Sequence, residues 1–300
     1  MDKKIRIVTH NGTFHADELF AIATLQIFLD GKPYEVIRTR DRAIIESADY
    51  VVDVGGSYDH AAHRYDHHQH GGAGTREHGI PYSSFGLVWK HFGEAIVGDA
   101  AIARRIDEQM CYPVDMGDNG YDYYGLIRQD VEPLLLQFVV AMFRPTWNTS
   151  APHHDERFAE LLVIFRRILH LAIEVEQDNL EGARFVEEAY QQATDKRIIV
   201  MDRAYPWHHT LAAHPEPLYV VKPKSVGTDW DVECVRDNPF GFENRKNLPS
   251  AWAGLVETDS KLPEVTGVAD AVFCHNRCYI AVARSKEGAL KLAQLAVEAA

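Results

Sequence analysis

The stretch KIRIVTHNGTFHADELFAIATLQIF (residues 4–28) decides the fold of the first half of this chain. Its first six residues read as a buried strand. A polar turn, HNGT, follows at 10–13. The largely apolar segment from Asp17 to Asp30 has the length of a helix, which Gly31 would end. A strand that leads directly into a helix indicates an α/β domain.

The alternation of strand and helix continues beyond this stretch. The sequence predicts a second strand at Tyr34–Thr39, a short helix at Arg42–Ala48 and a third strand at Tyr50–Val54. This order argues for a parallel sheet with helices on both faces. Further helices are predicted downstream, at 83–93, at 96–111, at 125–142 and as a helical pair within Arg157–Ala193.

From Arg197 onward the pattern changes. Short strand-like segments (IIVM, LYVVK, WDVECV, AVFCH and CYIAVA) alternate with turns rich in Pro, Gly and Asn, and a last helix starts at Glu287. Three hundred residues are long for one domain and comfortable for two. We therefore expect an α/β catalytic domain with a helical linker at 1–194, and a smaller α+β substrate-binding domain at 195–300.

The composition is ordinary for a globular protein, with 46% hydrophobic and 25% charged residues. The start of the chain shows no apolar signal segment and no stretch is long enough to span a bilayer, so a cytoplasmic protein is expected. A net charge of -13 argues against a broad duplex-binding surface, which needs many Lys and Arg contacts to phosphate. Four cysteines do not make a disulfide framework. Cys274 and Cys278, with His275 beside them, lack a second ligand pair at zinc-finger spacing.

Imidazoles and carboxylates gather where the predicted strands and turns end. The candidates are His10, His15, Asp17, Asp53, the run Asp66-His67-His68, and Asp115 and Asp118 in the predicted loop VDMGDNG. Because the carboxyl ends of the strands in an open α/β sheet meet at one crevice, we expect these side chains to converge. Each motif is weak alone, and Asp53 by itself could cap the turn before Gly55. Their conjunction in four loops at one sheet edge favours a metal site.

Mixed imidazole and carboxylate ligands suit a pair of divalent ions about 3.5–4 Å apart. They favour Mn, Fe, Co, Zn or Mg over softer metals. The predicted metal ligands are His10, His15, Asp17, Asp53, His67 and Asp118. Asp53 is the expected bridge between the ions and one of two predicted catalytic residues. The other is His68, which is expected to contact a phosphoryl oxygen or protonate the leaving group.

Specific motifs spread over nearly the whole chain. They are THNGTFHADE, VVDVGGSYD, RYDHHQ, YSSFGLVWKHFG, the GDNG of 117–120, RPTWN (144–148), AYPWHHTL (204–211), LPSAWAGL (248–255) and KEGAL (286–290). Together they resemble the melanocyte-proliferating-gene-1 family. That family is similar to the wider DHH phosphoesterases, which include exopolyphosphatases, inorganic pyrophosphatases and single-strand exonucleases.

The resemblance implies a DHH-type α/β domain with a smaller second domain. It also implies two ligand sets, one of His10, His15 and Asp53 and one of Asp17, Asp53, His67 and Asp118. His68 would face the substrate. Eukaryotic members act as 3′–5′ RNA exonucleases, whereas bacterial ones are often described only as metal-dependent hydrolases. We expect two divalent ions, with Mn preferred and Mg, Co, Fe or Zn as alternatives.

The chain departs from the family near its C-terminus. The family usually has a glycine pair there, whereas this chain has Ala281 and Val282, so a close approach of the backbone to phosphate is harder. His275, Arg284 and Lys286 remain as expected substrate-binding residues. We therefore expect short substrates to be favoured over long strands.

These observations predict a metal-dependent phosphodiesterase, namely a 3′–5′ exonuclease or oligonucleotidase on short single-stranded RNA or DNA. The alternatives are hydrolysis of a small phosphorylated molecule, such as a dinucleotide or pyrophosphate, and a metal-binding regulatory protein without turnover. Single-strand substrates need aromatic platforms and a basic track. The candidates are Trp147, Trp207, Tyr219 and Trp252, with Lys222, Lys224 and Arg245. Such aromatic residues are more often core residues than binding platforms. No membrane partner is expected, and a homodimer stays open.

Overall fold

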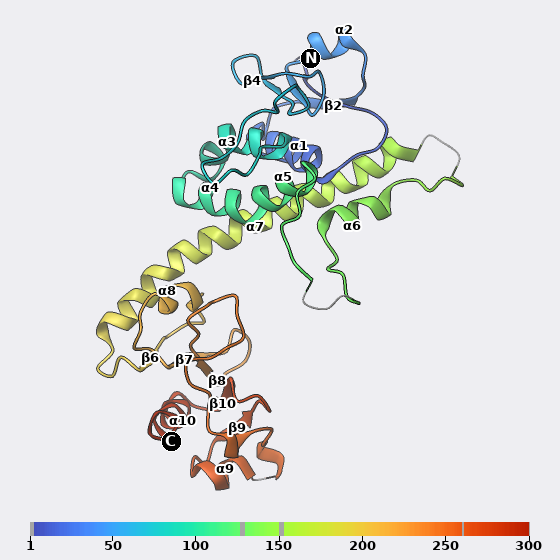
Figure 1. Ribbon diagram of the computed structural model, residues 1–300. Coiled ribbons are helices and arrows are strands. Elements are labelled where there is room, and N and C mark those ends of the chain that lie inside the picture. Colours follow the sequence, from blue (N-terminus) through green and yellow to red (C-terminus); the bar gives the residue numbers. More distant parts are fainter. Residues whose placement is uncertain (1–2, 127–129, 150–152, 260, 300) are drawn as a thin grey trace. The chain divides into compact units, whose positions relative to one another are not determined.

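The structure is a computed structural model that describes residues 3–126, 130–149, 153–259 and 261–299. The chain divides into two compact units, Met1–Glu176 and Gln177–Ala300. Figure 1 labels many of the elements of each unit, with colours that run from blue at the N-terminus to red at the C-terminus. Within the described ranges, no helix has both the length and the apolar character that a membrane span requires.

The first unit contains a five-stranded sheet in the order β2-β1-β3-β5-β4. Its strands are β1 (Ile5–Thr9), β2 (Tyr34–Arg38), β3 (Tyr50–Val52), β4 (Tyr58–Asp59) and β5 (Arg64–Tyr65). β1 pairs in parallel with β2 and β3, and β3 pairs in parallel with β5. The predicted α/β class is confirmed. The prediction of a wholly parallel sheet is wrong at one edge, where β4 runs antiparallel to β5, because two-residue strands leave no readable hydrophobic pattern.

Helices cover both faces of this sheet, because successive residues of a strand point to opposite sides. Ile7 packs into a large core with α1 (Ala16–Phe28) and α3 (Ser84–Val97). Val8 lies in a smaller core beside α2 (Arg42–Glu46). Helix α1 is buried along nearly its whole length, which explains why most of its faces are apolar.

The remaining helices of the first unit follow the sheet in the sequence. They are α4 (Ala100–Ile106), a π-helical turn (Asp107–Cys111), α5 (Tyr112–Asp118), α6 (Leu136–Phe143) and the first part of α7 (His153–Gln192), whose residues from Gln177 onward belong to the second unit. The helix predicted at 96–111 therefore continues through a π turn into α5. Helix α7 is a single helix where a helical pair was predicted, and no proline interrupts its sequence.

The helix predicted at 125–142 is wrong in its first part. The described residues before Leu136 are not helical, and 127–129 lie outside the described residues. Pro133 gives the physical reason, because its ring disfavours the helical conformation of the residue before it and removes a backbone donor.

The second unit has its own five-stranded sheet, in the order β6-β7-β8-β10-β9. Its strands are β6 (Ile198–Val200), β7 (Tyr219–Pro223), β8 (Trp230–Cys234), β9 (Ala271–Cys274) and β10 (Ile280–Ala283). β6 and β7 are parallel, and the other neighbours are antiparallel. Its helical segments are α8 (His208–Ala212), α9 (Lys261–Thr266), α10 (Lys286–Glu298) and short 3-10 turns at Ser250–Trp252 and Glu257–Asp259. Each of the five predicted strand segments is present.

Candidate metal centre

Two candidate histidines flank the turn between β1 and α1. His10 directly follows β1, and His15 is the N-cap residue of α1. The backbone N–H of His15 donates to both carboxylate oxygens of Glu18, at 2.9 and 2.8 Å. This capping interaction fixes the start of the helix and places Asp17 and Glu18 in its buried first turn.

Asp53 directly follows β3 and has a left-handed backbone conformation, with φ of +56°. Such a conformation costs about 1 kcal/mol or more outside glycine and persists only where the surroundings impose it. The two carboxylate oxygens face different histidines: Oδ2 lies 3.1 Å from His10 Nε2, and Oδ1 lies 3.4 Å from His67 Nε2. The Ser84 hydroxyl donates to Oδ1 at 3.1 Å. Asp53 is therefore placed to be shared between two ligand groups.

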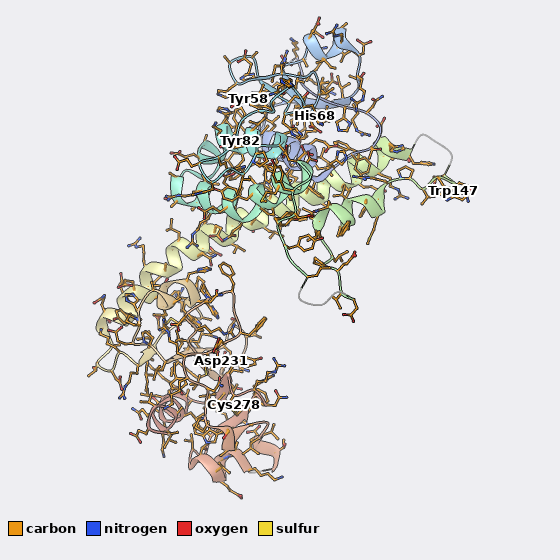
Figure 2. All side chains as sticks on the ribbon, viewed as in Figure 1. Tyr58, His68, Tyr82, Trp147, Asp231 and Cys278 are labelled. Carbon is orange, nitrogen blue, oxygen red and sulfur yellow. The ribbon has the colours of Figure 1, made fainter. Side chains whose placement is uncertain are left out.

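His67 and His68 are adjacent in sequence but have different surroundings. His67 is buried, and its Nε2 lies 3.1 Å from Asp118 Oδ2 and 3.9 Å from Asp17 Oδ2. The side chain of His68 is 61% exposed, and its Nδ1 lies 2.8 Å from Asp66 Oδ1. Figure 2 labels His68 among the side chains of the first unit. Because Asp66 holds Nδ1, the other ring nitrogen of His68 is available to a substrate.

The predicted ligands come together in three overlapping groups, each with its ligand atoms close enough to share an ion. The groups are His10, His15, Glu18 and Asp53; Asp53, His67 and His68; and His15, Asp17 and Asp118. Sequence reasoning missed Glu18, although it directly follows Asp17. Its position in the first turn of α1 was the available signal.

The state of Asp17 tests whether these residues fit a metal. Its side chain is fully buried, and neither carboxylate oxygen has a hydrogen-bond partner among the described residues. A buried carboxylate without partners is costly, and bound cations would satisfy it. The donor set of imidazole nitrogens and carboxylate oxygens therefore fits divalent ions.

The pKa values of the buried groups also indicate that the centre favours bound positive charge. Burial opposes the charged form of His10, but hydrogen bonds to Asp53 and Glu18 outweigh it and raise the pKa of His10 to about 10. Likewise burial opposes the charge on His67, and the nearby carboxylates of Asp118 and Asp53 raise its pKa to about 10. Burial and the nearby carboxylates raise the pKa of Asp17 well above its usual value. Without bound cations, His10, His67 and Asp17 therefore favour their protonated forms.

Two cavities flank the centre. One of about 460 Å³ is lined by His10, Asp53 and His68, among others. A second of about 300 Å³ is lined by Asp17, Asp118 and His68, among others. Each opens onto one part of the ligand set, and the exposed His68 borders both.

Arg40 is the one lysine or arginine that lines either cavity in the described part of the chain. It lies just beyond the carboxyl end of β2, at the same sheet edge as His10 and Asp53. Sequence reasoning missed it because an isolated arginine carries no motif. Its place after a parallel strand was the available signal.

A model of MYG1 exonucleases, described as an uncharacterised protein family (UPF0160), matches residues 6–297. The chain belongs to the MYG1 family. It is 32% identical to human MYG1 exonuclease, with 96% of this chain and 85% of the human protein covered. It is 30% identical to MYG1 proteins of Schizosaccharomyces pombe, covering 99% of both chains, and of Caenorhabditis elegans, covering 97% and 95%. The resemblance predicted from the sequence is confirmed.

In this MYG1 protein, the segment VDMGDNG is helical as far as Asp118 rather than the predicted loop. Asp115 lies within α5, and Asp118 is its last residue. Asp115 is buried, and its Oδ1 accepts from the Ser83 hydroxyl at 2.5 Å and from the Gly86 N–H at 3.1 Å. Its Oδ2 lies 2.8 Å from the Arg76 guanidinium. Asp115 thus fixes α5 from within the protein and lies in none of the three ligand groups.

Gly86 shows how closely α5 approaches α3. A Cβ built at Gly86 would lie 1.9 Å from Asp115 Oδ2 and 2.6 Å from Arg76 Nη2. A larger residue at position 86 would therefore displace the network that holds α5. The same Arg76 donates to both oxygens of Asp107, at 3.2 and 2.7 Å, and so also holds the π turn.

The three substrate-binding candidates of the C-terminal part lie in the second unit of this MYG1 protein. His275 follows β9, and Lys286 is the first residue of α10. Arg284 donates to both carboxylate oxygens of Glu257, at 2.7 and 2.6 Å. Ala281 and Val282, which replace the glycine pair, are buried in β10, between β8 and β9. The substrate-binding role of the three residues stays a prediction.

For three of the four aromatic candidates, the structure bears out the alternative that they are core residues. Trp207, Tyr219 and Trp252 are buried in the cores of the second unit, because their large apolar rings stabilise those cores. Trp147, by contrast, is 96% exposed.

The basic residues of that platform also have protein partners. Lys222 lies 3.0 Å from Asp231 and 2.7 Å from Glu233. The guanidinium of Arg245 lies 2.6 Å from Asp237 and donates to several backbone carbonyls. The Lys224 ammonium is 4.0 Å from Asp231. The predicted basic track is therefore occupied by ion pairs in the second unit.

Proposed function

We propose that this chain is a divalent-metal-dependent phosphodiesterase of DHH-like fold that removes nucleotides from the 3′ end of short single-stranded RNA or DNA. The observation that carries this proposal is the position of Asp53, whose two oxygens face the histidines of two ligand groups. That arrangement is the one needed for a carboxylate shared by two ions. The relatives named MYG1 exonuclease support a nuclease.

The residues would divide between the two ions as follows. His10, His15 and Asp53, with Glu18 beside them, would hold one ion, and Asp17, Asp53, His67 and Asp118 would hold the other. Bound divalent ions supply positive charge to the phosphoryl oxygens and a reactive water at neutral pH. Mn is proposed first, because the ligand set mixes imidazole and carboxylate.

The protein's own groups have defined tasks in this proposal. His68 donates a proton to the leaving oxygen from Nε2, since its Nδ1 is held by Asp66. The hydrogen bond to Asp66 raises the pKa of His68 against its partial burial, which favours the protonated form. Arg40 binds an anionic oxygen of the substrate in the larger cavity.

A second candidate is hydrolysis of a small phosphorylated molecule, such as a dinucleotide. The observation in its favour is the limited volume of the two cavities, about 460 and 300 Å³. A cavity of this size holds a small ligand but not a long strand.

One assay tests both candidates. The protein is stripped with chelator, reloaded with Mn, Mg, Co or Zn, and incubated with 5′-labelled five-nucleotide RNA and DNA, a dinucleotide and pyrophosphate. We expect metal-dependent release of mononucleotides and a ladder that shortens from the 3′ end. Cleavage of the dinucleotide alone would favour the second candidate. Stoichiometric metal binding without hydrolysis of any substrate would contradict both and leave a regulatory metal-binding protein.

A further inference from the structure

In the part of the sequence between α5 and α7, several apolar side chains are exposed. Phe138 is 42% exposed, Met142 71% and Trp147 96%. Phe138 and Met142 are four residues apart on α6, so they share one face of that helix. Figure 2 shows Trp147 directed away from the body of the unit, beyond α6. We name these three residues the α6 track.

The α6 track starts at the candidate metal centre. Gln137, the neighbour of Phe138, lines the same cavity as Asp17 and Asp118. Its side chain is held close to α5, since a Cβ built at Gly117 would lie 3.1 Å from the Gln137 amide nitrogen. From Gln137 to its last residue, Phe143, helix α6 then extends about 9 Å away from this cavity.

The other end of the α6 track meets a cavity of about 500 Å³ that Met142 helps to line. Arg144, His153 and Arg157 contribute to its wall, and no acidic residue does so among the described residues. Glu156 lies 2.8 Å from His153, and Glu160 lies 2.9 Å from Arg157. Arg144 is therefore the cation of this wall that no carboxylate pairs with among the described residues, and it is the group that would bind a phosphate.

Arg144 connects this cavity to the metal centre. Its Nε and Nη2 both donate to the carbonyl oxygen of Phe14, at 3.0 and 2.7 Å. Phe14 directly precedes His15, so one arginine joins the cavity wall to the ligand-bearing turn. The guanidinium is thereby fixed in position rather than free to rotate.

We propose that the α6 track binds the single-stranded part of the substrate, with bases stacked on Trp147 and Phe138 and a phosphate at the Arg144 cavity. The inference rests on the proposed function and names its substrate class as an oligonucleotide of several residues. Single-strand binders combine exposed aromatic rings with cationic side chains along the backbone path. Duplexes do not fit, because their base faces are already stacked.

The test compares Trp147→Ala with Trp147→Phe, and uses Val163→Ala, an exposed apolar position on α7, as the control. With Mn, KM for a ten-nucleotide RNA should rise about tenfold in Trp147→Ala, the scale of one lost stacking contact. Trp147→Phe should keep most of the affinity, and the control should match the wild type. All variants should hydrolyse bis(p-nitrophenyl) phosphate equally, because that ester has no bases to place on the track.

Fluorescence gives a readout that is independent of turnover. Trp147 is one of five tryptophans, and its indole is the most exposed of them. Oligo(U) should quench the emission of the wild type and not that of Trp147→Ala.

Three outcomes would overturn the inference. An unchanged KM for the RNA is one. A second is an equal loss of activity of Trp147→Ala on the RNA and on the small ester, since that would indicate a structural role of Trp147. A change of mass in light scattering between wild type and Trp147→Ala would assign the surface to a second copy of the chain. Failure of the proposed function looks different, because the wild type would then hydrolyse neither substrate.

Discussion

Asp53 combines an unfavourable backbone conformation with a central position among the ligands. At the residue scale, we expect Asp53→Ala to lose most of both ions, because its two oxygens serve both ligand groups. Metal content per chain after gel filtration in Mn measures this. Asp30→Ala, an exposed aspartate just after α1, should keep its ions. Full occupancy in Asp53→Ala would refute the shared carboxylate.

The neighbours His67 and His68 should separate in function. His67→Ala should weaken metal binding, because its Nε2 lies among Asp17, Asp53 and Asp118. His68→Ala should keep the ions but lower kcat by about 10²–10⁴, the usual scale for a proton donor. Calorimetric titration with Mn and turnover of the RNA measure the two effects. Equal loss of metal in both variants would exclude the role given to His68.

Arg40 and Arg42 form a natural pair for comparison, since both are exposed and only Arg40 lines the cavity. Arg40→Ala should raise KM about tenfold or more, as a charge-assisted contact to phosphate is lost. Arg42→Ala should behave as the wild type. The KM values for the dinucleotide and the RNA decide it, and similar values for both variants would remove Arg40 from the substrate site.

Several site residues were predictable, and the reason is local. His10 and Asp53 end strands of a parallel sheet, and that position brings them together whatever the rest of the chain does. Glu18 was missed although its position in the first turn of α1 was a local signal, and Arg40 was missed because an isolated arginine carries no motif. Trp207, Tyr219 and Trp252 are core residues, the more common place for large aromatic rings, but the sequence alone does not show which of the aromatic candidates are exposed.

At the scale of the element, α5 depends on a buried network. Arg76 pairs with Asp115 and Asp107, so Arg76→Gln should loosen α5 and with it Asp118. We expect metal affinity to fall about 10–100-fold, the usual effect of losing support behind a ligand. Mn titration measures it, with Arg104→Gln on the exposed face of α4 as control. Unchanged affinity in Arg76→Gln would show that Asp118 is held by other contacts.

The elements differ in how far the sequence determines them. β1, α1 and β7 lie close to their predicted limits because strong apolar patterns and a clear turn define each. Helix α5 was read as a loop, since Asp, Gly and Asn in VDMGDNG are turn formers and only the contacts of Asp115 in the folded unit stabilise a helix there. The β4–β5 hairpin could not be predicted, because its strands have two residues each and are too short to show a hydrophobic pattern.

At the scale of the whole molecule, we expect the second unit to contribute to substrate binding. Neutralising Arg284 and Lys286 should raise KM for RNA, as should added salt, because phosphate contacts are screened by ions. A small phenyl phosphodiester should be cleaved almost unchanged, since it makes no remote contacts. Arg203→Gln, an exposed arginine of the same unit, is the control. Loss of activity on the small ester would contradict a separate binding role.

Substrate length is a further property of the whole molecule. Ala281 and Val282 are buried between two strands, so β10 offers no glycine backbone to phosphate, and the α6 track ends at Trp147. We expect KM to fall from two- to five-nucleotide RNA and to change little at twenty. Assays at the three lengths measure this. Efficiency that rises steadily up to twenty nucleotides would indicate a processive exonuclease instead.

The carboxylate of Glu18 links ion binding to local motion in the main core helix. It accepts the His15 amide with both oxygens and also stands 3.3 Å from His10 Nε2. A cation that draws this carboxylate toward His10 loosens its hold on the amide. Deuterium uptake at the His15 N–H should then rise as the ion arrives, while amides in the middle of α1 exchange more slowly because the folded state is stabilised. The exchange rate of this one backbone hydrogen would thus report whether the ion site beside His10 and Glu18 is occupied.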